Sequence, residues 1–345
     1  MSTSTPLKRS ASPAPTTNTN GSPASKQTRL ATSPPPDTTI PTKILVLSDT
    51  HSLQLPLSAY PTDCQVILHT GDLTETGTPT ELKEALHQLS LIPAELRLAI
   101  PGNHDLSLDP VFWAPQGGSD ADATESRALV SHDPESYASS LGIHMLMEGT
   151  HDFRLKSGAS FRVYASPWTP IHGVSAFQYP TREDRFNTKD AGDAPEWSVN
   201  VANDASVIPG YEDERVDIVM VHGPMKSVLD DTPDGRSAGC EHLRRAIARA
   251  KPKLLCHGHI HCAYGAQRVR YKSDQADPIV PIAKEWVGKN QAKRKGYAAI
   301  PPGSTEEWNN SWKDGKIGQT LCLNAAISDD EGRVGNWPWV VCMDL

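Results

Sequence analysis

The segment KILVLSDTH, residues 43–51, decides the class of fold that this sequence predicts. Its aliphatic run, Ile44–Leu47, is uninterrupted and gives way at once to polar residues. A short, continuously apolar run of this kind is typical of a strand that is buried on both faces of a sheet. Asp49 and His51 would then lie just beyond the carboxyl end of the strand, which is where α/β sheets bind their ligands.

The same pattern recurs along the chain. Further short apolar runs occur at Val66–Leu68, Leu96–Ile100, Phe161–Ala165, Val216–Val221, Leu254–Cys256, Leu321–Ala325 and Trp339–Cys342. Between them, Pro79–Leu89 and Cys240–Ala250 place Leu and Ala at three- and four-residue spacings, which predicts helices. Alternating strands and helices predict an α/β fold.

The first 42 residues form a segment of different composition, rich in Ser, Thr and Pro, with no strand or helix period. Such a segment buries too little apolar surface to offset its ordering entropy, so we expect a disordered tail. It could be phosphorylated or direct nuclear import, although a passive solvated tail is the preferred interpretation. Residues 43–345 are expected to form one domain. Stretches near 115–136, 180–213 and 272–318 are expected to be long loops or insertions.

The charge of the chain limits the classes of partner. It has 345 residues with 33 basic and 41 acidic side chains, which gives a formal charge of −8. This balance argues against a general nucleic-acid-binding protein, which usually has a basic surface. A basic run at Lys289, Lys293, Arg294 and Lys295 leaves contact with a polyanion open, but a solvated insertion is the preferred interpretation.

Apolar runs and cysteines indicate the compartment. No run reaches the roughly 18 apolar residues of a transmembrane helix, and the N-terminus lacks the apolar core of a secretory signal. We therefore expect no membrane partner and a cytoplasmic location, with a nuclear one also open. The six cysteines include no CxxC pair and are expected to be reduced thiols.

Five polar clusters each follow a predicted strand. They are Asp49-Thr50-His51, Gly71-Asp72, Gly102-Asn103-His104-Asp105, His222-Gly223-Pro224 and Gly258-His259-Ile260-His261. Ligand sites gather beyond the carboxyl ends of the strands, so these clusters should meet at one edge of the sheet. Seven side chains of these clusters are candidate metal donors: Asp49, His51, Asp72, Asn103, His222, His259 and His261. Seven donors are too many for one tetrahedral ion, but they suit two ions that share a carboxylate.

The donor types indicate the metals and the chemistry. Oxygen and imidazole donors without thiolates favour divalent Mn, Fe, Zn, Ni or Co. Two such ions a few ångströms apart stabilise the attacking and leaving oxygens of a phosphate ester and lower the pKa of a bound water. The clusters therefore predict a dinuclear centre that hydrolyses phosphate esters.

At this point the sequence resembles a known family. DTH at 49–51, GD at 71–72, GNHD at 102–105, HGP at 222–224 and GHIH at 258–261 resemble the calcineurin-like metallophosphoesterases, over residues 43–265. LHTGD at 68–72 and ASPWTP at 165–170 are similar to the metallophosphoesterase-domain-containing (fetal-brain) proteins and their fungal relatives. The resemblance implies a sandwich of two mixed β-sheets flanked by helices.

The resemblance also implies a role for each donor. Asp49, His51 and His261 would hold the first ion, Asn103, His222 and His259 the second, and Asp72 would bridge them. A hydroxide activated by the metal ions would attack phosphorus. His104 would donate a proton to the leaving oxygen or bind the phosphoryl group, and Asp105 would orient the ring of His104. GDLTE at 71–75 departs from the GDxxD of the broader family at a position that does not bind metal there.

The expected function is the hydrolysis of a small phosphate ester, with a phosphodiesterase favoured over a protein phosphatase. The resemblance makes cyclic nucleotides or other small diesters candidate substrates. Two alternatives stay open: a metal-binding scaffold with little turnover, and a nuclease. The sequence does not define the substrate, the metal or the oligomeric state. The remaining histidines lack a strand-end motif, and most are expected to be surface or core residues: His69, His87, His132, His144, His151, His172 and His242.

Overall fold

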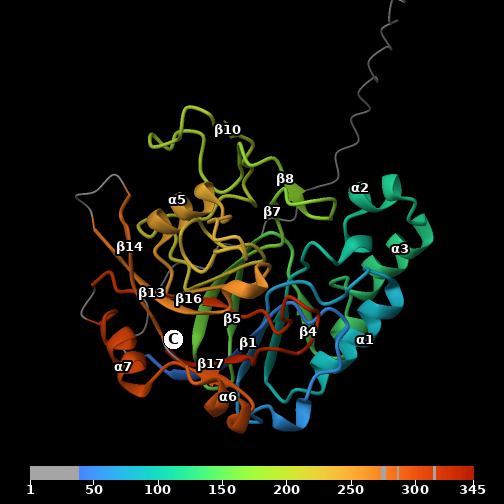
Figure 1. Cartoon of the computed structure of the whole chain (residues 1–345), viewed down its shortest axis with the longest axis horizontal. Helices are drawn as coiled ribbons and strands as arrows, with labels where there is room; N and C mark the ends of the chain where they lie inside the picture. The colour runs from blue at the N-terminus through green and yellow to red at the C-terminus, as the bar shows by residue number, and fades with distance from the viewer. Residues whose placement is uncertain (1–38, 273–276, 286, 314–315) are drawn as a thin grey trace, which may run out of the picture. The chain divides into compact units, whose positions relative to one another are not determined.

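Two β-sheets pack against each other in the computed structural model of the protein, which describes residues 39–272, 277–285, 287–313 and 316–345. Of the predicted disordered tail, residues 1–42, residues 1–38 lie outside the described residues. Residues 39–345 form one unit. Its strands and helices are shown in Figure 1.

The first sheet has six strands in the order β15-β17-β1-β2-β3-β4. Four of them run parallel: β1 (Pro41–Leu47), β2 (Val66–His69), β3 (Leu96–Ala99) and β4 (Ile143–Met145). Strand β17 (Trp339–Asp344) pairs antiparallel with β1, and β15 (Ala298–Ala299) pairs parallel with β17. This sheet is therefore mixed, as the family resemblance implied.

The second sheet has seven strands in the order β14-β13-β16-β12-β11-β6-β5. Its parallel centre consists of β6 (Ser160–Ser166), β11 (Ile218–Val221), β12 (Leu254–His257) and β16 (Thr320–Asn324). Antiparallel strands flank this centre: β5 (Gly149–Arg154), β13 (Gly265–Tyr271) and β14 (Ile279–Glu285). Two small ladders complete the strands: β7 (Thr169–Pro170) with β8 (Gln178–Tyr179), and β9 (Glu183–Asp184) with β10 (Val199–Asn200).

Apolar side chains on the two faces of the sheets form three buried clusters. Ile44 and Val46 of β1 face the second sheet, whereas Leu45 and Leu47 pack under helix α1 (Pro79–Ser90). On the second sheet the other face packs under helix α5 (Glu241–Ala250). Successive strand residues point to opposite faces, so both faces of each central strand are buried. The fold is thus an α/β sandwich of two mixed sheets flanked by helices, with α1 and α5 well apart in Figure 1.

Both flanking helices begin at a side chain that caps the first turn. Thr78 and Glu81 form a reciprocal capping box at the start of α1. At the start of α5, the thiol sulfur of Cys240 accepts a hydrogen bond from the backbone N–H of Leu243 at 3.2 Å. The two helices predicted from the sequence therefore form where they were expected.

Three segments contain more regular secondary structure than the sequence predicted. Strand β1 begins at Pro41, inside the predicted tail, because Thr42 is fully buried and pairs with Met343 of β17. The segment 115–136, expected to be a long loop or an insertion, contains helix α3 (Asp120–Leu129), which is capped by Ser119. The segment 272–318 contains β14 and two helices, α6 (Lys289–Lys295) and α7 (Pro302–Asn310). Helix α7 is fixed by Trp308, which is completely buried.

The remaining helices are short. They are α2 (Pro110–Trp113), α4 (Tyr137–Ser140), η1 (Leu57–Ala59), η2 (Leu106–Leu108), η3 (Ala114–Gln116) and η4 (His261–Ala263). Among the described residues, no helix has the length and apolar character needed to cross a membrane. All six cysteines are free thiols, in agreement with the expectation from the sequence.

Candidate metal centre

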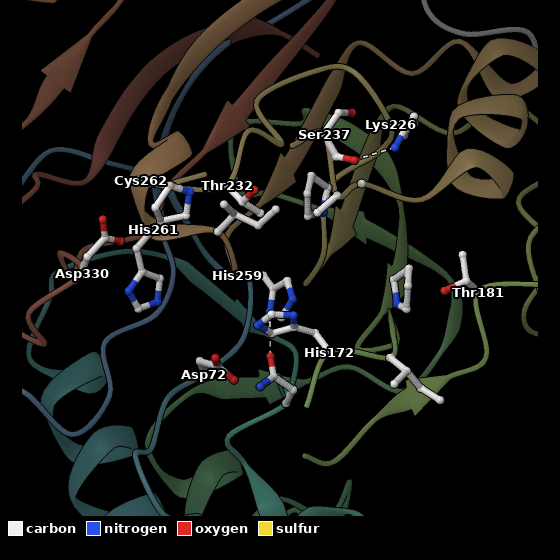
Figure 2. Close-up of a pocket in the computed structure, with 18 of the residues that line it drawn as sticks. Asp72, His172, Thr181, Lys226, Thr232, Ser237, His259, His261, Cys262 and Asp330 are labelled. Atoms are coloured by element: carbon white, nitrogen blue, oxygen red, sulfur yellow. Dashed lines mark hydrogen bonds between the residues drawn. The ribbon is translucent and has the colours of Figure 1, made fainter. Parts of the chain in front are cut away.

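The loops that follow β1, β2, β3, β11 and β12 meet at one edge of the sandwich. All seven predicted donors lie on these loops, and Asp49, Asp72 and His222 are almost completely buried. Figure 2 shows Asp72, His259 and His261 among the residues that line a pocket there. The structure therefore brings together the residues that the sequence singled out.

The backbone of these loops adopts an unusual conformation at several donors. Asp49, His51, Asp72 and His259 have φ values of 53°, 43°, 54° and 69°. This left-handed region is uncommon for residues other than glycine and costs about 1 kcal/mol or more for each residue. Such strain persists where the surrounding structure enforces it, and it concentrates at functional sites.

Close packing of the loops also depends on glycine. A Cβ at Gly258 would overlap Oδ2 of Asp49, and one at Gly102 would overlap the backbone nitrogen of Asp72. These glycines let the loops approach closely enough for the carboxylates to reach the donor groups of other strands.

Asp49, His51 and His261 form one candidate cation site. The Nε2 atoms of His51 and His261 lie 3.3 Å apart, and Nε2 of His261 lies 3.4 Å from Oδ1 of Asp49. Ligand atoms at about 2.1 Å from one cation are themselves roughly 3 Å apart. The spacing of these atoms therefore fits a single divalent ion.

Asn103, His222 and His259 form a second group of donors. Oδ1 of Asn103 lies 2.9 Å from Nε2 of His222 and 2.7 Å from Nδ1 of His259. Oδ2 of Asp72 lies 3.3 Å from Nε2 of His222 and 3.6 Å from Nε2 of His51. Asp72 thus stands between the two groups, where a bridging ligand is expected.

The outward-facing atoms of three donors are held by neighbouring groups. Nδ1 of His222 lies 2.9 Å from the carbonyl oxygen of Thr70, and Nδ1 of His261 lies 3.3 Å from that of Asp329. These carbonyls require the N–H tautomer at Nδ1, which leaves the lone pair of Nε2 directed at the candidate ions. Nδ2 of Asn103 donates to Oγ of Ser175 at 2.9 Å, so its oxygen faces the donor group.

The electrostatics of the site also fit bound cations. Burial opposes ionisation of Asp49, but His261, His222 and His51 outweigh it and hold the pKa of Asp49 well below its usual value. Burial likewise opposes ionisation of Asp72, and His222 outweighs it, so this pKa is also low. Burial lowers the pKa values of His222 and His261, but the carboxylates reverse this and raise both to about 9. Two buried anions surrounded by imidazoles attract cations, whether protons or metal ions.

His104 lines the pocket, but Asp105 does not contact its ring. Nδ1 of His104 lies 2.9 Å from the carbonyl oxygen of Glu75. The buried carboxylate of Asp105 instead accepts hydrogen bonds from the N–H groups of Gly102 and Thr74, at 2.7 and 3.0 Å. The interpretation that Asp105 orients the ring is therefore wrong, because Asp105 ties together the loops after β2 and β3. Burial and the charge of Asp72 raise the pKa of Asp105 to about 6.

Sequence reasoning missed the contacts of Glu75. Oε2 of Glu75 lies 3.0 Å from Nδ1 of His51, although the pair is not aligned for a hydrogen bond. His51, Glu75 and His104 together also form a cluster of potential ligand atoms. The signal was present in GDLTE, where Glu75 stands at the last position of the family's GDxxD.

The pocket beside the donors has a volume of about 560 Å³. Its walls include His172, which was expected to be an ordinary surface or core residue and whose ring lies 6.2 Å from that of His259. Lys226 and Asp330 also line it. Trp168, by contrast, is partly buried and packs against the apolar cluster beneath α5, with the guanidinium of Arg185 4.2 Å from its ring.

Comparison with known proteins identifies the class of protein. Residues 42–263 match the family of calcineurin-like phosphoesterases, which covers the five loops described above. The chain belongs to this family. Membership and the two donor groups together support a metal-dependent phosphoric ester hydrolase.

Individual relatives differ in length. The chain is 31% identical to human metallophosphoesterase domain-containing protein 1 over 228 residues, 65% of this chain and 62% of the human protein. It is 28% identical to a probable rhamnogalacturonate lyase C of Emericella nidulans over 269 residues, 77% of this chain and 20% of that protein. The chain thus spans less than two thirds of either relative. A purple acid phosphatase from yellow lupin aligns with a TM-score of 0.37 and 13% identity, over 69% of this chain and 40% of that chain, too weakly to carry an argument.

Proposed function

We propose that the protein is a phosphodiesterase that uses two divalent metal ions to hydrolyse a small phosphodiester. The observation that carries the proposal is the pair of donor groups on either side of Asp72, with His104 in the lining of the same pocket. The metal ions, when bound, would lower the pKa of a water and neutralise charge on the phosphoryl oxygens. Mn, Fe, Zn, Ni and Co all suit this donor set.

His104 is the residue proposed to move the proton. The carbonyl oxygen of Glu75 accepts from its Nδ1, so Nε2 is left to exchange a proton with the leaving oxygen or to donate to the phosphoryl group. Asp105 contributes indirectly, because it fixes the loop that carries Asn103 and His104. The contacts of Thr70 and Asp329 hold the two ligand imidazoles in one tautomer.

The lining of the pocket favours a diester over a monoester. A phosphomonoester dianion is usually recognised by arginine forks. The described residues that line this pocket include one lysine and no arginine. A volume of about 560 Å³ leaves room for substituents on both sides of a phosphorus atom. Cyclic nucleotides belong to this size class.

The test is turnover by the full chain after loading with each of the five metals. We expect hydrolysis of bis(p-nitrophenyl) phosphate to exceed that of p-nitrophenyl phosphate. His104→Ala should lower kcat by roughly 100-fold with unchanged metal content, and Asp72→Asn should lose both metal and turnover. His87→Ala, on the exposed face of α1, is the matched control. If both site variants kept wild-type turnover with full metal, the proposal would fail.

The two alternatives give different results. A metal-binding scaffold would bind two ions and hydrolyse none of these esters. A nuclease would show salt-sensitive binding to single-stranded DNA. The basic residues Lys289, Lys293, Arg294 and Lys295 lie on α6 and do not line the pocket, which favours a small substrate over nucleic acid. We further propose a reducing compartment, the cytoplasm or nucleus, because all six thiols are free. Microscopy of a tagged protein would test this.

A further inference from the structure

Lys226 contributes a positive charge to the lining of the pocket. Its Nζ donates to the carbonyl oxygen of Ser237 at 2.5 Å. In the part of the chain that the structure describes, no carboxylate forms an ion pair with it. Lys226 is only partly exposed, so a counter-ion would have to enter the pocket to reach it.

Neighbouring cations are paired. Arg236 lies 2.6 Å from Asp234, Lys284 lies 3.4 Å from Asp231, and Arg244 lies 2.8 Å from Asp277. The chain as a whole is acidic, with a formal charge of −8. An ammonium group that has no ion pair among the described residues, in a pocket of such a chain, is suited to an anion that comes from outside the chain.

The loop that carries Lys226 is held in a fixed conformation. The carboxylate of Asp230, 1% exposed, accepts hydrogen bonds from the N–H groups of Ser227 and Gly239 at 3.0 and 2.8 Å, and from Oγ of Ser237. The guanidinium of Arg244 donates to the carbonyl oxygen of Lys226 itself at 2.8 Å. Lys226 is therefore positioned by its support, as a ligand-binding residue requires.

We propose that Lys226 binds a second negatively charged group of the substrate, so that the preferred substrate is a small phosphodiester that also carries a carboxylate, a sulfate or another phosphate. The inference rests on the proposed function and specifies its substrate class. Asp330 lies on the other side of the pocket in Figure 2, next to His261. Attraction to Lys226 and repulsion from Asp330 would orient the second anion within the pocket.

The experiment compares two esters that differ by one charge. The probes are p-nitrophenyl phenyl phosphate and p-nitrophenyl 4-carboxyphenyl phosphate, which have the same leaving group, given to the metal-loaded full chain. We expect kcat/KM for the carboxylated ester to be about tenfold higher, the effect of one charge-assisted hydrogen bond. Lys226→Met should reduce this preference to about onefold, and Lys226→Arg should retain it. Lys83→Met, on the exposed face of α1, is the matched control and should keep the wild-type preference.

Binding measurements separate failure of this inference from failure of the proposed function. If neither ester is hydrolysed, the proposed function is wrong, and calorimetry with phenylphosphonate and 4-carboxyphenylphosphonate then tests Lys226 alone. About tenfold tighter binding of the carboxylated compound, lost in Lys226→Met, supports the second-anion subsite. Equal kcat/KM values for the two esters in the wild type, equal binding of the two phosphonates, or an unchanged preference in Lys226→Met overturns it.

Discussion

Asn103 and Ser175 hold each other through two hydrogen bonds although they come from loops after different strands. Nδ2 of Asn103 donates to Oγ of Ser175 at 2.9 Å, and Oγ of Ser175 donates to the carbonyl oxygen of Asn103. The N–H of Ala176 donates to the same carbonyl oxygen at 3.1 Å. The amide of Asn103 can therefore present only its oxygen to His222 and His259.

Removing the hydroxyl of Ser175 should weaken binding of one ion only. Ser175→Ala frees the amide of Asn103 to rotate, and partners of this kind typically change metal affinity by roughly tenfold. We expect calorimetric titration of the metal-free protein to show one weakened site of two. Ser175→Thr keeps a hydroxyl at this position and should retain the wild-type affinity. Ser140→Ala is the control, because the hydroxyl of Ser140 donates to the carbonyl oxygen of Tyr137 in α4, and it should leave the affinity unchanged. Identical titrations for Ser175→Ala and wild type would contradict this role.

Glu75→Gln should lower the affinity for metal of the candidate site formed by Asp49, His51 and His261. Oε2 of Glu75 is the nearest negative charge to Nδ1 of His51, at 3.0 Å, and its loss makes the imidazole a poorer donor. We expect a loss of several-fold in affinity at this site, measured by competition with a chromogenic chelator. The exposed Glu84→Gln on α1 is the control. An affinity equal to that of the wild type would show that the 3.0 Å approach has no role in metal binding.

Chelation should lower the melting temperature. Asp49 and Asp72 are buried anions, and ions that bind the folded state stabilise it by about 2.7 kcal/mol at 100 times the dissociation constant. We expect a decrease of several degrees in Tm with EDTA, reversed by excess Mn²⁺ or Zn²⁺. Asp49→Asn should largely abolish this difference. Asp152→Asn is the control: it removes the ion pair between exposed Asp152 of β5 and Arg162 of β6, and the difference in Tm should remain. A Tm independent of metal would argue against bound ions in the folded protein.

Gly258→Ala should abolish the metal-dependent change in Tm. The new Cβ would overlap Oδ2 of Asp49 and the side chain of Ser48, both rigidly held. The loop after β12, with His259 and His261, would have to move away from the first sheet. Gly303→Ala is the control because nothing lies within 4 Å of its Cβ, and in α7 it should be neutral or slightly stabilising. A Gly258→Ala protein that binds metal like wild type would show that the loops tolerate this displacement.

The sequence predicted where the candidate donors would meet because their positions depend on a rule of topology. Parallel strands with apolar residues on both faces bring the loops after them to one edge, so the proximity of Asp49, Asp72 and His222 could be expected without coordinates. Ser175, Glu75 and Asp329 could not, because their contacts depend on how irregular loops fold over that edge. The left-handed backbone of Asp49 and His259 likewise leaves no mark in the composition.

Elements of the fold were missed where their apolar pattern is weak. Strand β5 exposes Thr150, Asp152 and Arg154 at the edge of its sheet, so it lacks the continuous run that identified β1. Helix α7 buries a single large side chain, Trp308, and α3 buries only Ala123 and Ser126. The cap at Ser119 in α3 and the tertiary packing of Trp308 in α7, rather than periodicity, decide these helices.

The pairing of β17 with β1 has a consequence for the order in which the protein folds. Pro41 is paired with Asp344, so one side of β1 stays open until residues 339–344 have folded back onto it. The loop before β17 also supplies the carbonyl oxygen of Asp329 that holds His261. Contacts of such long sequence separation form late and slowly. The edge that carries the candidate metal ligands is therefore completed late in folding, and a chain cut before β17 would have an incomplete first sheet and a poorly held His261.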